Sequence, residues 1–204
     1  SGPSWQGEGR FYASWDSVDS SLIGHADGAA GKAGSALSGG VTWEDYGDRT
    51  TGGGDVVSPT GFKVRAGDAK WTQDLSDSSE IMLSAQILEQ PSTPRIDELV
   101  PGYGEEDPSS LIYEFKPNRR SFLHARYRLH GTSNWFERME IHVARQVMVD
   151  DRLSQEFGST ERVDESNQST LDGVTAQFNT PWGSVESASR ELVWGVEYYT
   201  DTVD

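Results

Sequence analysis

The segment Phe122-Leu123-His124-Ala125-Arg126-Tyr127-Arg128-Leu129-His130 alternates strictly between apolar and polar side chains, apart from its first residue. Successive side chains of an extended chain point to opposite faces, so one face of this segment is apolar and the other is basic. Residues 192–199, Leu-Val-Trp-Gly-Val-Glu-Tyr-Tyr, repeat the period of two. The period predicts β-strands in both places.

Further runs of this kind are separated by stretches rich in Gly, Pro, Ser and Asp. We expect strands over Gly61–Ala66, Glu80–Leu88, Ser110–Lys116, Phe136–Val149, Val174–Phe178 and Glu191–Tyr199. Residues 150–172 are polar and predict a short helix or an exposed excursion. Residues 1–60 are rich in Gly and Ser and have little periodicity. The sequence therefore predicts one all-β domain over 1–204: an antiparallel β-sandwich or jelly roll over 61–204, with a small barrel as a further alternative, preceded by an arm and loops over 1–60.

Acidic residues outnumber basic ones almost two to one. The chain has 33 Asp and Glu against 17 Lys and Arg, of which 4 are Lys, and a net charge of -16 over 204 residues. Such a charge destabilises a compact state at low salt, whereas at about 1 M salt the Debye length falls to roughly 3 Å and the repulsion is screened. We expect a protein adapted to high salt, although an ordinary acidic domain has a similar charge balance.

One segment departs from this acidic background. Residues 111–150 hold 7 basic and 4 acidic residues, and the candidate interface residues within them are Arg119, Arg120, Arg126 and Arg128. Two interpretations fit. The arginines pair across the sheet with acids such as Glu140, or they form an interface with the acidic surface of an identical or related subunit or with the phosphates of lipid or nucleic acid.

Catalytic signatures are weak throughout. The chain has no cysteine and no G-x-S-x-G motif, and the closely spaced His25 and Asp27 lack an evident third metal ligand. We expect no enzymatic activity and no cofactor, while the question of a bound metal ion stays open.

No stretch approaches the roughly 18 to 20 apolar residues of a membrane-spanning helix. We therefore expect no transmembrane segment, and no direct binding to nucleic acid.

Four tryptophans lie outside the clearest strand patterns: Trp5, Trp15, Trp43 and Trp182. Exposed indole rings stack on sugar rings, so these residues are candidate glycan contacts. Alternatively, they close the ends of a sandwich, because tryptophan is usually buried. The glycan interpretation defines an alternative function, a carbohydrate-binding β-sandwich module of a halophilic secreted or surface protein.

The alternating strands from 61 to 199, together with the acidic, lysine-poor composition, resemble structural proteins of haloarchaeal viruses, in particular the single jelly-roll capsid type. This resemblance implies a virion protein, made in the host cytoplasm, that forms homo-oligomers or pairs with a related subunit. A tail-tube or turret protein of a halophilic virus would share the pattern. The resemblance implies assembly through the arginine-rich strand.

Overall fold

The computed structural model describes residues 4–131, 135–185 and 188–204, and almost all of its regular structure is β-strand. The strands are β1 (Gln6–Asp16), β2 (Ser21–Lys32), β3 (Ser35–Tyr46), β4 (Arg49–Thr50), β5 (Val56–Val57), β6 (Phe62–Ser76), β7 (Ser79–Gln90), β8 (Thr93–Pro94), β9 (Ser110–His130), β10 (Arg138–Glu156), β11 (Val163–Glu165), β12 (Gln168–Val185) and β13 (Ala188–Val203). The helix α1 (Ile96–Leu99) is a single turn. Within the described ranges, no helix has the length and apolar character needed to cross a membrane.

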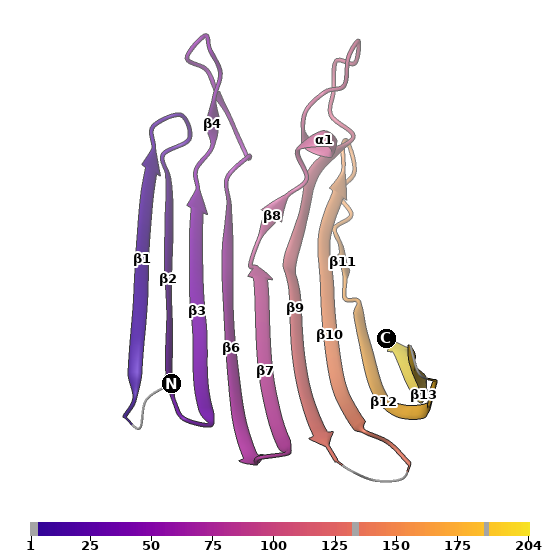
Figure 1. Ribbon diagram of the computed structural model, residues 1–204. Coiled ribbons are helices and arrows are strands. Elements are labelled where there is room, and N and C mark those ends of the chain that lie inside the picture. Colours follow the sequence, from indigo (N-terminus) through magenta and orange to yellow (C-terminus); the bar gives the residue numbers. More distant parts are fainter. Residues whose placement is uncertain (1–3, 132–134, 186–187) are drawn as a thin grey trace.

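The long strands form one continuous sheet. Its order is β1-β2-β3-β6-β7-β9-β10-β12-β13, with every neighbouring pair antiparallel, and β8 and β11 pair with the outer parts of β9 and β10. The short strands β4 and β5 form a separate hairpin. Figure 1 shows this arrangement as a curved wall in which each long strand lies beside the next one along the chain. The topology is therefore a meander.

The two ends of the wall differ in their connections. At one end, tight turns join β2 to β3 and β6 to β7, leaving two residues between the paired strands. At the other end, the chain makes long excursions over 47–61, 91–109 and 157–167; the first two rise above the sheet in Figure 1, whereas the third returns beside β10, with which its strand β11 pairs. Below, these are called the turn end and the loop end of the sheet.

The sheet has no conventional core. Among the described residues, the large apolar side chains that are buried are Met82, 7% exposed, and Val149, 8% exposed. A domain in water normally buries the apolar side of a sheet against a second layer. Here the sheet is a single layer, so both of its faces are accessible. Its apolar side chains are not covered by other parts of the described chain.

The prediction of an all-β, antiparallel fold is confirmed, and each expected strand run overlaps a strand, although the runs from Gly61 and from Phe136 begin one and two residues before β6 and β10. The runs 110–116 and 122–130 are parts of the single 21-residue strand β9. The expected jelly-roll order differs from the structure, in which consecutive long strands pair in one sheet. Alternation identifies a strand and its faces, but it does not say which strand lies next to it, and here short hairpin turns keep neighbours together.

The expected arm over residues 1–60 is not found. This part of the chain forms β1, β2 and β3, which are fully paired in the sheet. Its glycines have a packing role: a Cβ on Gly24 would collide with the indole ring of Trp43 on the neighbouring strand. Glycine next to a cross-strand aromatic ring makes room for that ring within the sheet. Glycine content alone therefore gave a misleading signal for loops.

Candidate functional site

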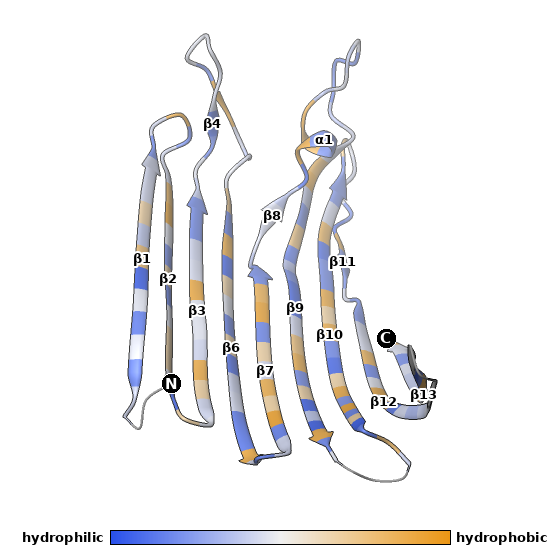
Figure 2. Ribbon diagram, viewed as in Figure 1, coloured by the Kyte–Doolittle hydropathy of each residue, from blue (hydrophilic) through white to orange (hydrophobic). Residues whose placement is uncertain are grey.

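The strand register separates the side chains into two contrasting faces. Cross-strand partners share a face, so the pairs Trp71 with Leu83, Leu83 with Ala125 and Ala125 with Val143 trace one apolar surface across four strands. The large apolar side chains of this apolar face are Phe11, Trp15, Leu22, Leu37, Val41, Trp43, Trp71, Ile81, Leu83, Ile87, Leu123, Tyr127, Leu129, Met139, Ile141, Val143, Val147, Val149, Val174, Phe178, Leu192, Trp194, Val196 and Tyr198. The opposite side is the polar face. Figure 2 shows the resulting alternation of colours along each strand.

Side chains on the apolar face are widely accessible. Leu123 is 57% exposed and Val196 is 66% exposed, at positions well inside the sheet or near its edge. Monomeric soluble proteins rarely leave a continuous apolar surface of this extent open to water. The apolar face is therefore a contact surface.

A row of charged side chains borders the apolar face toward the loop end. This charged border consists of Asp45, Lys63, Arg65, Glu89, Arg119, Arg145 and Asp172. Lys63 Nζ lies 2.7 Å from Asp45 Oδ2, and Arg145 Nε lies 3.8 Å from Asp172 Oδ1. These charges bound the main apolar surface on one side, so that it forms a band; Leu22 lies level with the border, and Val147 and Val149 lie beyond it on the same face.

The charged border crosses the strands obliquely. Following the register from Asp45 on β3 to Asp172 on β12, it shifts toward the turn end by two residues on β6, from Lys63 to Arg65, and by four on β10, from Val149 to Arg145. With about 3.3 Å per residue and about 4.8 Å between strands, this is a drop of about 20 Å over a width of about 24 Å. The band is inclined by about 40° to the direction of the interstrand hydrogen bonds, an angle that follows from the same spacings.

The other edge of the band slopes the same way. Its last large apolar residues are Leu37 on β3 and Trp71 on β6, which lie in the same cross-strand row, and Leu129 on β9 and Leu192 on β13, which lie four and six residues further toward the turn end. Both edges of the band therefore slope in the same direction, so the strands cross it at an angle.

The polar face carries a network of paired charges on β7, β9 and β10. Arg126 Nη2 donates to Glu80 Oε1 at 2.6 Å, and Arg128 Nε donates to Glu140 Oε1 at 2.7 Å. Arg138 also donates to Glu140. The Glu140 side chain is only 14% exposed, so this network is partly shielded from solvent although it lies on a sheet surface. Side chains on this part of the polar face are thus paired and partly shielded, whereas those on the apolar face are widely exposed.

Next to these ion pairs lie two stacked imidazoles. The rings of His124 and His142 have centroids 5.3 Å apart, and His124 Nε2 lies 3.0 Å from His142 Nδ1. Arg120 Nε donates to Gln146 Oε1 at 2.8 Å and lies over the ring of Phe122. The described residues hold no group of three or more His, Cys, Asp or Glu side chains suited to a metal ion.

The four arginines singled out from the sequence are not brought together. Arg120, Arg126 and Arg128 lie on the polar face, whereas Arg119 lies in the charged border on the apolar face. Arg126 and Arg128 make the ion pairs within the chain that the first of the two interpretations expects. A role for these arginines between subunits stays a prediction.

The four candidate tryptophans are also dispersed. Trp15 and Trp43 are on the apolar face near the loop end. Trp5 precedes β1 with Lys32 Nζ 5.4 Å from its ring centroid, and Trp182 lies near the turn end of β12. Stacking on one sugar needs rings on one surface, and these four side chains do not form such a platform. Sequence reasoning missed Trp71 and Trp194, which share the apolar face and which the period of two could have identified.

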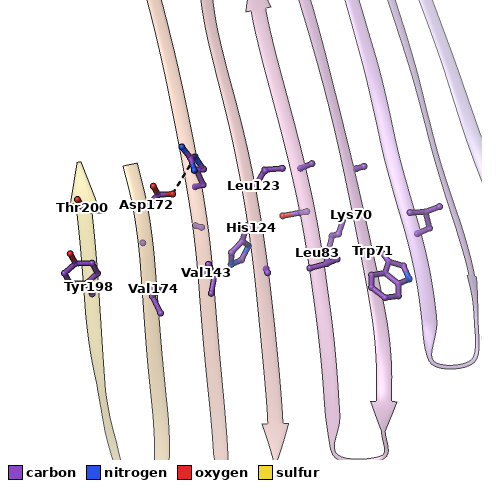
Figure 3. A pocket seen from close by; sticks show the side chains of 18 residues that line it. Lys70, Trp71, Leu83, Leu123, His124, Val143, Asp172, Val174, Tyr198 and Thr200 are labelled. Carbon is purple, nitrogen blue, oxygen red and sulfur yellow. Dashed lines mark ion pairs between the residues drawn. The ribbon is translucent and has the colours of Figure 1, made fainter. Parts of the chain in front are cut away.

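A shallow depression of about 660 Å³ lies on the apolar face. Figure 3 shows its side chains spread over adjacent strands, with Trp71, Leu83, Leu123, Val143, Val174 and Tyr198 among them and with the ion pair of Asp172 at its rim. Small residues such as Ala69 and Ala85 form the floor. The depression is long and apolar and has no convergent set of polar groups of the kind that fixes a small polar ligand.

Comparison with known proteins gives a likeness of fold. The chain is similar to the copper transporter OprC, with a TM-score of 0.65 and 15% sequence identity, over 100% of this chain and 29% of the transporter. The chain thus corresponds to less than a third of the length of that protein. No protein-family model matches the chain. The curated proteins gave no match either. At this identity, the likeness is evidence for the fold alone.

The predicted function, a virion structural protein, is wrong, and the alternative of a carbohydrate-binding sandwich module is not retained. A solved structure that matches the whole chain is a transporter, not a capsid, tail or turret subunit. The physical reason for the error is that alternating strands are shared by sandwiches, jelly rolls and single-layer walls. These folds differ in how their strands pair and in what register. Here the register shows one sheet in which both edges of the apolar band run obliquely across the strands.

Proposed function

We propose that this chain forms part of the wall of a transmembrane β-barrel. In this proposal, the apolar face contacts the lipid acyl chains and the polar face lines the barrel interior. The loop end and the turn end lie on opposite sides of the membrane. The observation that carries the proposal is the inclination of the apolar band, because strands of transmembrane barrels are tilted by about 35 to 45° from the membrane normal. A band inclined by about 40° to the hydrogen-bond direction implies the same tilt.

The strand dimensions support this placement. A tilted strand needs about 9 to 11 residues to cross the hydrocarbon layer. The long strands have 11 to 21 residues, so each is long enough to cross, and the longer ones such as β9 continue beyond the bilayer. On β6, the apolar face is free of charged and amide side chains between Arg65 and Gln73, a stretch of about 26 Å along the strand. At a tilt of about 40° this corresponds to a thickness of about 20 Å, near the roughly 25 Å of known apolar bands.

Aromatic residues near both edges of the band add support. Trp15 and Trp43 lie near the edge at the loop end, and Trp71 and Trp194 lie near the edge at the turn end. Tryptophan favours the membrane interface because its ring is apolar while its N–H needs a polar partner. Short turns at one end and long loops at the other are a further general feature of such barrels.

The absence of a second layer among the described residues has an explanation in this proposal. The lipid solvates the apolar face, so no sandwich partner is needed, and paired backbone groups within the sheet satisfy the hydrogen bonding that the bilayer interior demands. Acyl chains fill the depression on the apolar face. The likeness of the whole chain to part of a transporter is consistent with a wall segment.

The experiment that tests the proposal reconstitutes the protein into phosphatidylcholine vesicles and measures quenching of tryptophan fluorescence by lipids brominated along the acyl chain. We expect strong quenching by the brominated lipids and weak quenching by acrylamide, a water-soluble quencher, for the tryptophans of the apolar face. A protein that folds to the same strand content in buffer, with tryptophans open to acrylamide and insensitive to the brominated lipids, would contradict the proposal.

A further inference from the structure

We infer that Arg65 and Arg119, in the charged border of the apolar face, bind the phosphate of an anionic membrane lipid. The inference rests on the proposed function, because it takes the apolar face as the lipid-contacting surface. The partner is a lipid whose acyl chains lie in the depression on the apolar face and whose phosphate headgroup lies at the edge of the band near the loop end.

Register places the two arginines in a single cross-strand row. Arg65 on β6 pairs with Glu89 on β7, and Glu89 pairs with Arg119 on β9. Two strand spacings, about 10 Å, separate the arginine backbones. Guanidinium groups on side chains of this length reach one headgroup from both sides, and their planar forks donate two parallel hydrogen bonds to phosphate oxygens.

Both arginines are available for such contacts. Their side chains are exposed, and no ion pair involving either of them occurs in the parts of the chain that the structure describes. By contrast, Lys63 in the next row is held by Asp45, and Arg145 lies beside Asp172. In a chain with a net charge of -16, two arginines without an ion pair at the edge of an apolar surface favour an anionic partner.

The neighbouring residues define what the partner must contain. Trp43 is the cross-strand partner of Arg65, on the side away from Glu89, and offers an indole ring at the headgroup level. On the turn-end side of the row formed by Arg65, Glu89 and Arg119, Ile87 and Leu123 provide apolar contact for acyl chains. Glu89 lies between the arginines, and its negative charge repels an anion and weakens the site. Removal of this charge should therefore strengthen binding of the anionic lipid. The combination favours a lipid over a free phosphate ion, because a free ion gains nothing from the apolar side chains below.

The test measures lipid binding to the protein reconstituted in phosphatidylcholine vesicles that contain a small fraction of nitroxide-labelled phosphatidylglycerol or nitroxide-labelled phosphatidylcholine. Preference for the anionic lipid is read from the immobilised fraction of each label. We expect a preference in the unmodified protein that falls about fivefold in Arg65→Gln or Arg119→Gln and about twentyfold in the double variant. Glu89→Gln is expected to increase the preference.

A matched control removes the same charge elsewhere. Arg49 and Arg162 are exposed and lie in the loop-end excursions, so Arg49→Gln combined with Arg162→Gln lowers the net charge equally. An equal loss in this control, an unchanged preference in the Arg65 and Arg119 double variant, or full competition by soluble glycerol phosphate would overturn the inference. Failure of every variant to enter vesicles, seen as the absence of any immobilised lipid, refutes the proposed function itself. Insertion without lipid preference refutes only the lipid site.

Discussion

An arginine placed in the middle of the apolar band separates the membrane account from any account in water. Ala69 on β6 is exposed on the apolar face, four residues from Arg65 on one side and four from Gln73 on the other. At about 3.3 Å per residue, it lies about 13 Å along the strand from each edge. With a tilt of about 40°, this is a depth of about 10 Å inside the band.

At this depth, Ala69→Arg places a guanidinium close to the centre of the hydrocarbon layer. The expected loss in the free energy of unfolding is about 2–4 kcal/mol, the range found for arginine near the bilayer midplane. The matched control is Ala29→Arg on β2, which is also exposed but lies on the polar face, with Glu8 as its cross-strand partner. There the new charge stays in water and meets an acid, so we expect a change within about 0.5 kcal/mol.

Both variants are measured by urea unfolding of the protein in phosphatidylcholine vesicles, with strand content followed by circular dichroism. Equal losses in the two variants, or a larger loss in Ala29→Arg, would refute the assignment of the two faces. Unfolding of the unmodified protein and of both variants in detergent provides a reference. In detergent, the difference in the free energy of unfolding between the two variants is expected to be smaller, because a micelle adapts to a surface charge more readily than a bilayer.

The remaining predictions concern the fold and the loops. Arg128→Glu brings a third carboxylate beside Glu80 and Glu140 and should lower the free energy of unfolding by about 2–4 kcal/mol, measured by urea in vesicles; a neutral result would mean that the network does not contribute. Gly24→Ala places a methyl group against the ring of Trp43 and should cost about 1–3 kcal/mol, whereas Gly67→Ala meets ordinary contacts and should be tolerated; thermal unfolding of both variants decides, and equal tolerance would contradict the packing argument. Asp48 accepts backbone hydrogen bonds from Thr60 and Gly61 at 2.7 and 2.8 Å. A hydrogen bond with the side chain of Ser58, followed by these backbone bonds, lowers the pKa of Asp48 below its ordinary value of 3.8. A lowered pKa stabilises the folded loop above about pH 4, and this stabilisation is lost as the carboxylate is protonated at lower pH. The protection factor of the Gly61 amide, which compares its exchange rate with the intrinsic rate at the same pH, should therefore fall below about pH 4, and Asp48→Asn should remove most of that pH dependence; an unchanged profile would contradict the assignment.

Much of the strand content was predictable from the sequence. The period of two in 122–130 and 192–199 correctly identified strands and their faces, since alternation of side chains is a property of one strand. The oblique band was not predictable in the same way. It depends on the register between Lys63, Glu89, Arg119 and Arg145, which lie on different strands, and a single sequence contains no direct measure of register.

Two features of the sequence hid the membrane interpretation. A search for 18 to 20 consecutive apolar residues detects helices, whereas the strands here place a polar residue after almost every apolar one. The glycines near Trp43 gave the first 60 residues the composition of a flexible arm, although β1, β2 and β3 within this range are paired strands. The acidic composition led to the expectation of a high-salt environment, which stays a prediction.

The most direct test of the central claim is an environment scan along β3. The protein has no cysteine, so single cysteines at positions 36–42 carry a fluorophore without background labelling. In vesicles, we predict that nitroxide lipids quench labels at Leu37, Gly39 and Val41, and that an aqueous quencher reaches labels at Ala36, Ser38 and Gly40. A strict period of two supports a lipid-facing and a water-facing side. Equal access of the aqueous quencher to all positions would contradict the barrel-wall account.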